Sequence, residues 1–400
     1  MENHAGSRRA GMFPPFLKHE APEISHFTFH FSHFTHTQMP PHLFTDISSH
    51  GFGHLAQAAP VLNALQTRVP ELRLTIRCAL PEEKLRSRIH GAFELIPGSS
   101  DFGFAMLDAV RIDYATSAQR YRDFHADWAN KVEKERRLFA ALRPDLVLTD
   151  VAYLPLAGAA QAGIRSVSMC SLNWGGLFAH YYAQESWAGP ILDEILAAYR
   201  SVECFLRLMP AMPMPELPRT RALAPVAALG TRRRAELCER LGVAVKERIV
   251  LVAYGGFDCD LQAARWPQTP GLCWLIPQAW GLQRADMRSI ESCGLPFTDL
   301  LASVDAVLTK PGYGTFTEAT CNGTPVLYQR RDNWPEQDCL IDWLAQHGRC
   351  REVDPACFLD GRIERLLSEV LAETPPARPL PEGAAEVAEL LVDWLKPQAE

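Results

Sequence analysis

Short apolar runs and segments with helical spacing alternate along most of the chain. The run HLFTDIS, which starts at His42, has the length of a strand. From His54 to Arg68, apolar residues recur three and four positions apart, as on the buried face of a helix. The run DLVLTD at 145–150 has no charge inside it, which is typical of a strand buried on both faces. Strands that alternate with helices in this way predict βαβ units and parallel sheets.

A proline-rich segment interrupts this alternation. Residues 207–220 read RLMPAMPMPELPRT and contain four prolines. Proline fixes φ and has no N–H group to donate, so neither a helix nor a central strand fits there. We therefore predict a linker at 207–220, an N-terminal domain at 41–206 and a C-terminal domain at 221–400. The expected fold class is α/β, with two doubly wound, Rossmann-like domains that face a cleft and a last helix that can return to the N-terminal domain.

Composition narrows the class of protein. The 400 residues, 47% of them hydrophobic, allow two domains with separate cores. A net charge of -7 argues against nucleic acid as a main partner. No apolar run approaches the roughly 18 residues of a transmembrane helix, and the N-terminus lacks the apolar core of a signal peptide. The 11 cysteines form no CxxC pair, which fits free thiols in a reducing compartment. We expect a cytoplasmic protein whose oligomeric state stays open.

Residues 1–40 differ from the rest of the chain. Histidines crowd the segment HFTFHFSHFTHTQMPPH, which begins at His26. Such tracts can bind transition metals, but a disordered leader explains the composition more simply. We predict the leader.

The first candidate site is the junction DISSHGFGHLAQAAP at 46–60, where a strand ends and a helix begins. Ligands of open α/β sheets bind outside the carboxyl ends of strands, and the first N–H groups of a helix attract an anion. Gly51 and Gly53 let the backbone turn tightly, and His54 would begin the helix. The ordinary pKa of histidine, about 6.5, suits a general base. A glycine turn with His54 as a simple cap explains the same residues without a ligand.

The second candidate site is TKPGYGTFTEATCNGTP at 309–325, again between a strand and a helix. Gly312 and Gly314 free the backbone, and Thr315 supplies a hydroxyl, as in a turn that holds phosphate. Glu318 lies one turn further on and could accept hydrogen bonds from the two hydroxyls of a ribose. The alternative is a capping box between Thr315 and Glu318, which explains neither both glycines nor Lys310.

The third candidate site is QRRDNWPEQD at 329–338, after the next predicted strand. Arg330 and Arg331 could pair with a diphosphate. Glu336 or Gln337 could take sugar hydroxyls. A solvated charged loop is the alternative.

These segments resemble a known superfamily. The donor-binding motif of GT-B nucleotide-sugar glycosyltransferases resembles GTFTEATCNGTPVLYQRRDNWPEQ at 314–337. The acceptor-domain loop of the same superfamily, which includes the peptidoglycan N-acetylglucosaminyltransferase and plant UDP-sugar glycosyltransferases, resembles SHGFGHLAQAAPVLNAL at 49–65. The chain also resembles the glycosyltransferase-like N-terminal half of L-arabinokinases, through the segments GFGH, NWGGLFAHYY, AYGGFD, KPGYGTFTEA and RRDNWPEQ. The resemblance covers roughly 43–350 and implies a GT-B fold, with the acceptor on the N-terminal domain and the donor on the C-terminal one.

The resemblance also implies roles for single residues. His54 matches the acceptor base, and Asp150 falls where the aspartate that orients this base lies. Lys310 stands where many relatives have a phosphate-binding histidine. The residues expected to bind the donor are Gly255, Gly256, Lys310, Gly312, Tyr313, Gly314, Thr315, Glu318, Arg330, Arg331, Glu336 and Gln337. The residues expected on the acceptor side are His50, Gly51, Gly53 and Asn173.

The expected function is therefore an inverting, metal-independent transfer of a sugar from a nucleoside-diphosphate sugar, with a UDP-sugar as the expected donor, to an acceptor hydroxyl. We assign no metal, because the DxD-like DCD at 258–260 follows a Gly-Gly turn, and no cofactor beyond the donor substrate. The partners expected are the nucleotide sugar and an unidentified acceptor. A non-catalytic module that binds a nucleotide sugar or a partner enzyme is the alternative, and an epimerase that eliminates the diphosphate is a weaker third option.

Overall fold

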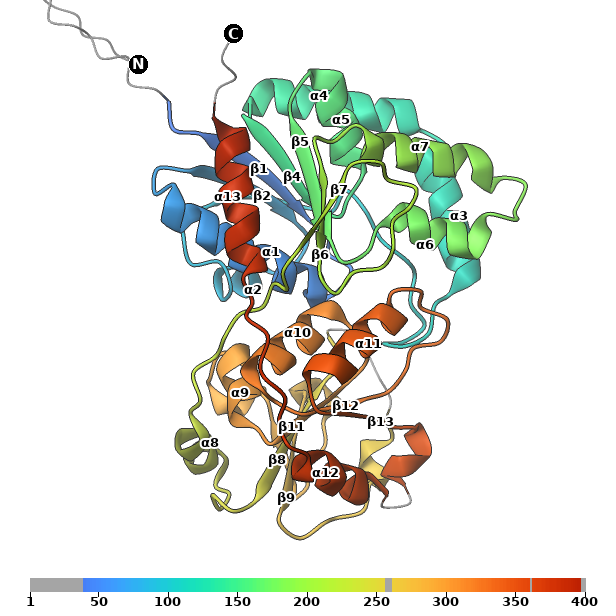
Figure 1. The fold of residues 1–400 in the computed structure, drawn as a ribbon. Helices are drawn as coiled ribbons and strands as arrows, with labels where there is room; N and C mark the ends of the chain where they lie inside the picture. Colours follow the sequence, from blue (N-terminus) through green and yellow to red (C-terminus); the bar gives the residue numbers. More distant parts are fainter. Residues whose placement is uncertain (1–38, 256–260, 360–361, 397–400) are drawn as a thin grey trace, which may run out of the picture. The chain divides into compact units, whose positions relative to one another are not determined.

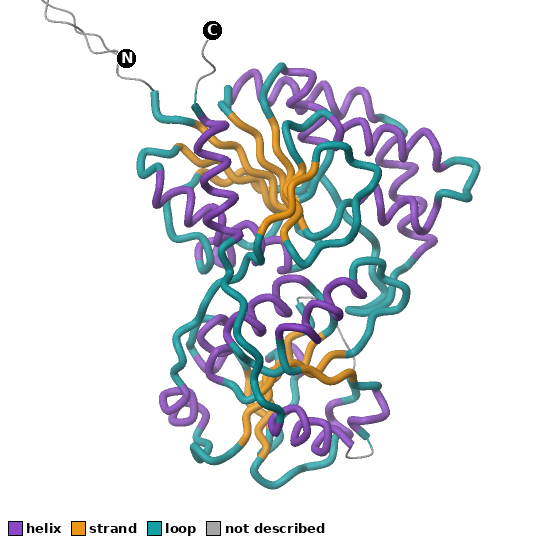
Figure 2. The backbone as a smooth tube through the Cα atoms, in the orientation of Figure 1, coloured by secondary structure: helices purple, strands orange, loops and turns teal. Residues whose placement is uncertain are grey.

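The computed structural model describes residues 39–255, 261–359 and 362–396. The predicted leader, Gly256 and the DCD segment lie outside these residues. The described chain builds two parallel sheets, each flanked by helices (Figures 1 and 2). The predicted α/β class with two doubly wound sheets is thus confirmed.

The first sheet has seven strands in the order β3-β2-β1-β4-β5-β6-β7, and all neighbouring strands pair in parallel. The strands are β1 (His42–Ile47), β2 (Arg73–Cys78), β3 (Glu94–Pro97), β4 (Leu146–Asp150), β5 (Ser166–Cys170), β6 (Phe205–Leu208) and β7 (Thr220–Leu223). Its helices are α1 (Phe52–Arg68), α2 (Glu82–Arg86), α3 (Tyr114–His125), α4 (Trp128–Leu142), α5 (Leu154–Ala162), α6 (Trp174–Tyr182) and α7 (Ala188–Arg200). We call residues 42–223 the first half.

The second sheet has six strands in the order β10-β9-β8-β11-β12-β13, again all parallel. They are β8 (Arg248–Ala253), β9 (Leu272–Ile276), β10 (Met287–Ser289), β11 (Ala306–Thr309), β12 (Val326–Tyr328) and β13 (Cys350–Glu352). The helices that accompany it are α8 (Arg234–Leu241), α9 (Phe297–Ser303), α10 (Tyr313–Asn322), α11 (Gln337–His347) and α12 (Arg362–Ala372). We call residues 234–372 the second half.

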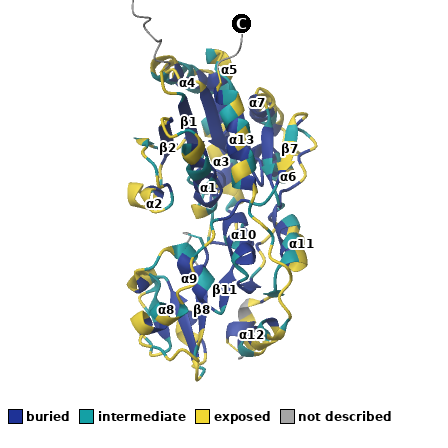
Figure 3. Cartoon of the chain, turned by 60° about the vertical axis from the view of Figure 1, so that its left-hand side comes forward, coloured by how far each residue is buried: buried dark blue, intermediate teal, exposed yellow. Residues whose placement is uncertain are grey.

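The central strands of both sheets are buried on both faces, and the exposed residues lie mainly on the outer helices (Figure 3). Every residue of β1 and β4 is buried. Apolar residues can therefore fill these strands without alternation, because helices cover both faces of a parallel sheet.

The chain passes between the sheets later than the sequence predicts. The predicted linker at 207–220 begins inside β6 and ends at the first residue of β7, and both strands belong to the first sheet. The four prolines all lie between the two strands, so β6 and β7 contain no proline and can both pair in the sheet. The passage runs instead through residues 224–233, between β7 and α8. The last helix, α13 (Gly383–Leu395), packs against α1 and β7 of the first half.

Candidate active site

The junction between β1 and α1 forms the tight turn predicted at its first glycine. Gly51 is the N-cap of α1 and has a φ of 88°, a left-handed conformation that favours glycine. Gly53 lies inside α1, which begins at Phe52 rather than at His54. The prediction that Gly53 helps the turn is therefore wrong. His54 is not a cap either, because it lies in the first turn of the helix and is buried.

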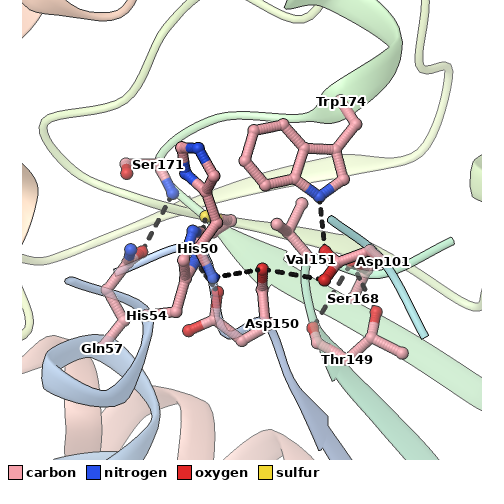
Figure 4. Close-up of polar contacts among 12 residues, drawn as sticks. His50, His54, Gln57, Asp101, Thr149, Asp150, Val151, Ser168, Ser171 and Trp174 are labelled. Atoms are coloured by element: carbon pink, nitrogen blue, oxygen red, sulfur yellow. Dashed lines mark hydrogen bonds and ion pairs between the residues drawn. The ribbon is translucent and has the colours of Figure 1, made fainter. Parts of the chain in front are cut away.

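His54 and Asp150 lie together at one edge of the first sheet. Asp150 ends β4, and the register of the two adjacent strands pairs it with Ile47, the last residue of β1. Nδ1 of His54 lies 2.9 Å from Oδ1 of Asp150, and both side chains are buried (Figure 4). The sheet therefore brings together the two residues that the sequence pairs.

The electrostatic environment favours a charged imidazole at His54. Burial lowers the pKa of His54, but the charge and hydrogen bond of Asp150 outweigh this cost, and the net shift is upward. Burial raises the pKa of Asp150, and His54 opposes that shift. The carboxylate fixes the proton of the neutral ring on Nδ1, so Nε2 is the atom able to accept another proton.

Two residues that the sequence analysis missed border this pair. The ring of Trp174 lies 5.8 Å from that of His54, and its Nε1 donates to Asp101 at 2.7 Å. Ser48 also donates to Asp101, and burial raises the pKa of that carboxyl. Trp174 follows β5, so its place at a strand end was a usable signal. Asp101 lies in an irregular loop after β3, where no pattern marks it.

A cavity of about 500 Å³ lies beside these residues in the first half. Its walls combine aromatic rings with carboxylates and hydroxyls, and its lining residues are Ser49, His50, Ser99, Asp101, Phe102, Phe104, Ala105, Met106, Asp113, Thr116 and Arg120. Burial, with His54, Arg331 and Lys310 nearby, holds the pKa of His50 well below its ordinary value. His50 thus presents a neutral ring to the cavity.

The predicted acceptor-side residue Asn173 has another use. It is the N-cap of α6, where its side-chain oxygen, Oδ1, accepts a hydrogen bond from the N–H of Gly176 at 2.7 Å. Its amide nitrogen donates to Glu216 at 2.8 Å, and the residue is fully buried. These contacts are internal to the fold, so the geometry explains Asn173 without a ligand.

A group of possible metal ligands coincides with the histidine–aspartate pair. The ligand atoms of His54, Asp150 and Cys170 all lie within 4.8 Å of one another, and all three residues are buried. The Cys170 sulfur is 3.9 Å from Nδ1 of His54. Nitrogen, oxygen and sulfur ligands at this spacing could hold a zinc-like ion.

The two glycines at the start of α10, Gly312 before the helix and Gly314 inside it, act differently from the prediction. Gly312 is the N-cap of α10 with extended backbone, and no side chain caps the helix. The capping-box alternative for Thr315 and Glu318 is therefore wrong. A Cβ added to Gly314 would lie 2.6 Å from Cβ of Ala56 on α1. Glycine is needed there because the two helices meet closely, and Figure 3 shows α1 above α10.

Glu318 is buried and faces the first half. Its carboxylate forms an ion pair with Arg88, which follows α2, and accepts a hydrogen bond from the backbone of Ala228. Burial raises the pKa of Glu318, and Arg88 opposes the shift. Tyr313 is used in a similar way, since its hydroxyl donates to the carbonyl of Met209 and accepts from the N–H of Val226.

The two arginines predicted to bind a diphosphate differ in burial and in their partners. Arg330 is paired with Asp338 at 2.8 Å and with Glu352 at 3.2 Å, near the surface. Arg331 is buried, its guanidinium lies 3.5 Å from the centre of the Trp334 ring, and burial lowers its pKa to about 10. Within the described part of the chain, Nε of Arg331 has no hydrogen-bond partner. Arg331 is therefore the better candidate for an anion ligand.

Two further donor-motif residues, Glu336 and Gln337, lie close to Arg331. Glu336 is buried and accepts from Ser171 of the first half at 2.6 Å. Gln337 is bonded through both its amide atoms to the backbone of Arg331, so it braces this loop instead of facing a sugar. A Cβ built at Gly255 or Gly312 would lie 4.0 or 3.5 Å from Nζ of Lys310, which places this amine between the two turns.

Comparison with solved structures establishes the fold. Over 89% of this chain and 98% of the other, it superposes on the Medicago truncatula glycosyltransferase UGT71G1 complexed with UDP-glucose, with a TM-score of 0.57 and 11% identity. Over 90% of this chain and 95% of the other, it superposes on the glycotransferase of kitacinnamycin, with a TM-score of 0.56 and 15% identity. The chain thus has the GT-B fold of two Rossmann-like domains, as the resemblance implied, and its structural neighbours are glycosyltransferases.

In sequence, the chain is similar to an L-arabinokinase of Arabidopsis thaliana, at 26% identity over 310 residues. The match covers 74% of this chain but 29% of that protein, so the chain spans less than a third of its relative's length. No family model matches the chain. No helix of the described residues has the length and apolarity needed to cross a membrane.

Proposed function

We propose that this protein is an inverting, metal-independent glycosyltransferase that uses a nucleoside-diphosphate sugar, with a UDP-sugar as the first donor to test. The observation that carries the proposal is the buried pair of His54 and Asp150. The ring of Trp174 lies next to that of His54 and donates to Asp101, which lines the cavity of the first half. A base oriented by a carboxylate, next to a cavity that can take an acceptor, has the parts needed to activate a hydroxyl.

In this mechanism, Nε2 of His54 takes the proton of the acceptor hydroxyl. The acceptor oxygen attacks the anomeric carbon from the side opposite the diphosphate, and the bond to the diphosphate oxygen breaks with its electron pair. Asp150 stabilises the imidazolium that forms. Arg331, Lys310 and the first N–H groups of α10 stabilise the departing diphosphate, which makes a metal unnecessary.

The test is release of UDP by the purified protein from a panel of UDP-sugars, with water or an added alcohol as acceptor. Release should be slow and should fall strongly in His54→Ala. The matched control is His347→Ala on α11, which removes a histidine that packs against Trp343. Release that is equal in the two variants would contradict the proposal.

A second function is a nucleotide-sugar-binding module without transfer activity. The observation that favours it is that Glu318 and Glu336 are both already bound by residues of the first half, Arg88 and Ser171. The same panel separates the two functions. A module would bind UDP-sugars in calorimetry and release no UDP beyond the uncatalysed rate.

A further inference from the structure

Arg88 stands where it can compete with a nucleotide. It lies in the first half, between α2 and β3, and its guanidinium pairs with Glu318 on α10 of the second half. In the resemblance to GT-B glycosyltransferases, Glu318 is the carboxylate expected to bind the two hydroxyls of a ribose. The ion pair therefore occupies a carboxylate oxygen, Oε1 of Glu318, that a bound nucleoside would need.

The ion pair between Arg88 and Glu318 is largely buried. The side chain of Glu318 is 2% exposed, and that of Arg88 is 18% exposed. A buried carboxylate is costly unless a positive charge or several donors satisfy it. Arg88 supplies the charge across the two halves, and Ala228 supplies one donor from the connecting segment. In this arrangement Glu318 is satisfied without any ligand.

We propose that Arg88 is a latch, which holds Glu318 and must withdraw before the ribose of a nucleotide can bind there. This inference rests on the proposed function, because it assumes that Glu318 belongs to the donor site. The latch regulates that site, since a protein that is mostly latched binds its ligand with an affinity reduced by the small unlatched fraction.

The latch predicts an effect opposite to simple electrostatics. A nucleoside diphosphate is an anion, so removal of a nearby arginine should weaken its binding if Arg88 is an ordinary ligand. If Arg88 competes for Glu318, its removal leaves a buried carboxylate that two ribose hydroxyls can satisfy. Binding should then become tighter.

Calorimetry with UDP measures the sign directly. Arg88→Ala should bind UDP about tenfold more tightly than the unchanged protein. The matched control is Arg86→Ala, which removes the same charge two positions away, where the arginine pairs with Glu82 near the surface. The control should bind UDP no more tightly than the unchanged protein.

A second variant guards against misfolding, because Arg88→Ala leaves Glu318 without its cation. Arg88→Gln keeps a hydrogen-bond donor and removes the charge, so it should also tighten UDP binding. Thermal unfolding of each variant shows that the protein measured is folded.

The outcomes separate this inference from the proposed function. Equal or weaker UDP binding in both Arg88 variants, with binding by the unchanged protein, overturns the latch and leaves the proposed function standing. Tighter binding without UDP release from UDP-sugars supports the latch and favours the binding module. Absence of UDP binding in every folded variant overturns the latch and the UDP-sugar donor site together.

Discussion

Nδ1 of His54 lies 2.9 Å from Oδ1 of Asp150, although 96 positions separate the two residues in the chain. Adjacent parallel strands, β1 and β4, end side by side and bring them together. Asp150 lies on β4 and His54 in the first turn of α1, so regular elements hold both residues and leave them little freedom to separate. Its members should therefore behave as a unit in any reaction that they catalyse.

A double-mutant cycle tests this unity. His54→Ala should lower UDP release by about 10²–10⁴-fold, because a general base contributes about that much. Asp150→Asn should lose less, and the double variant should be little slower than His54→Ala, because residues that act as a unit are not additive. The rates are measured under saturating UDP-sugar. Losses that multiply in the double variant would show that the two residues act separately.

The pH dependence of UDP release follows from the raised pKa of His54. A base works when it is deprotonated, so kcat/KM should rise with pH along a limb whose apparent pKa lies above 6.5. Asp150→Asn removes the charge that raises this pKa and leaves the burial that lowers it, so the limb should move to lower pH. NMR titration of His54 gives the same shift without catalysis. An unmoved limb and titration would contradict the pairing.

The neighbouring arginines offer a matched comparison for anion binding. Arg331→Gln should weaken UDP binding by about 1.5–3 kcal/mol, or roughly 10- to 150-fold, since charge-assisted hydrogen bonds contribute that much. Arg330→Gln should change it little, because Arg330 is engaged by Asp338 and Glu352 near the surface. Calorimetry measures both affinities, and thermal unfolding checks the fold. Equal losses would indicate a diffuse charge effect instead of a built site.

The contact between α1 and α10 predicts unequal effects of two glycine substitutions. Gly314→Ala should lower the free energy of unfolding by about 1–3 kcal/mol, because its methyl would meet Cβ of Ala56 at 2.6 Å. Gly53→Ala is the control, since its built Cβ has nothing within 4 Å. Denaturant unfolding measures both. A tolerated Gly314→Ala would mean that the helices can move apart without cost.

Chelation tests the proposed absence of a metal. UDP release should survive excess EDTA, because Lys310 and Arg331 supply positive charge for the diphosphate. If a metal takes part instead, the group of His54, Asp150 and Cys170 is where it would bind. A metal would lie there if EDTA abolished UDP release by the unchanged protein and added zinc restored it. In that case, zinc should fail to restore UDP release in Cys170→Ala.

The sequence predicts the parts of this site that follow from sheet topology. Asp150 ends a recognisable strand, and His54 lies in the first turn of the helix that follows another strand, so their meeting depends mainly on the order of the strands. The turn at Gly51 and the buried strands β1 and β4 follow from local pattern in the same way. The misplaced linker shows the limit, since the sequence contains no signal that β7 pairs at the edge of the first sheet.

Contacts between distant loops cannot be predicted in this way. Arg88 lies in a charged stretch that looks like any solvated surface, and its pairing with Glu318 depends on how the two halves meet. Asp101 lies outside every strand and helix, yet it contacts Trp174 and Ser48. Asn173 and Gln337 are the residue types that the resemblance leads us to expect in the site. In the structure, however, the side-chain amide of each is hydrogen-bonded to other groups inside the fold.

The return of α13 to the first half has a mechanical consequence. The chain crosses between the halves twice, at 224–233 and at 373–382, and the crossings are joined where Gly383 donates to the carbonyl of Pro225 at 3.1 Å and Glu386 accepts from the N–H of Ala224 at 2.8 Å. Two tethers bonded side by side resist twisting and stretching more than one tether does. Bending about the two segments costs less, so we expect the two halves to open by a hinge motion. Cleavage of either connecting segment would let the two halves rotate relative to each other.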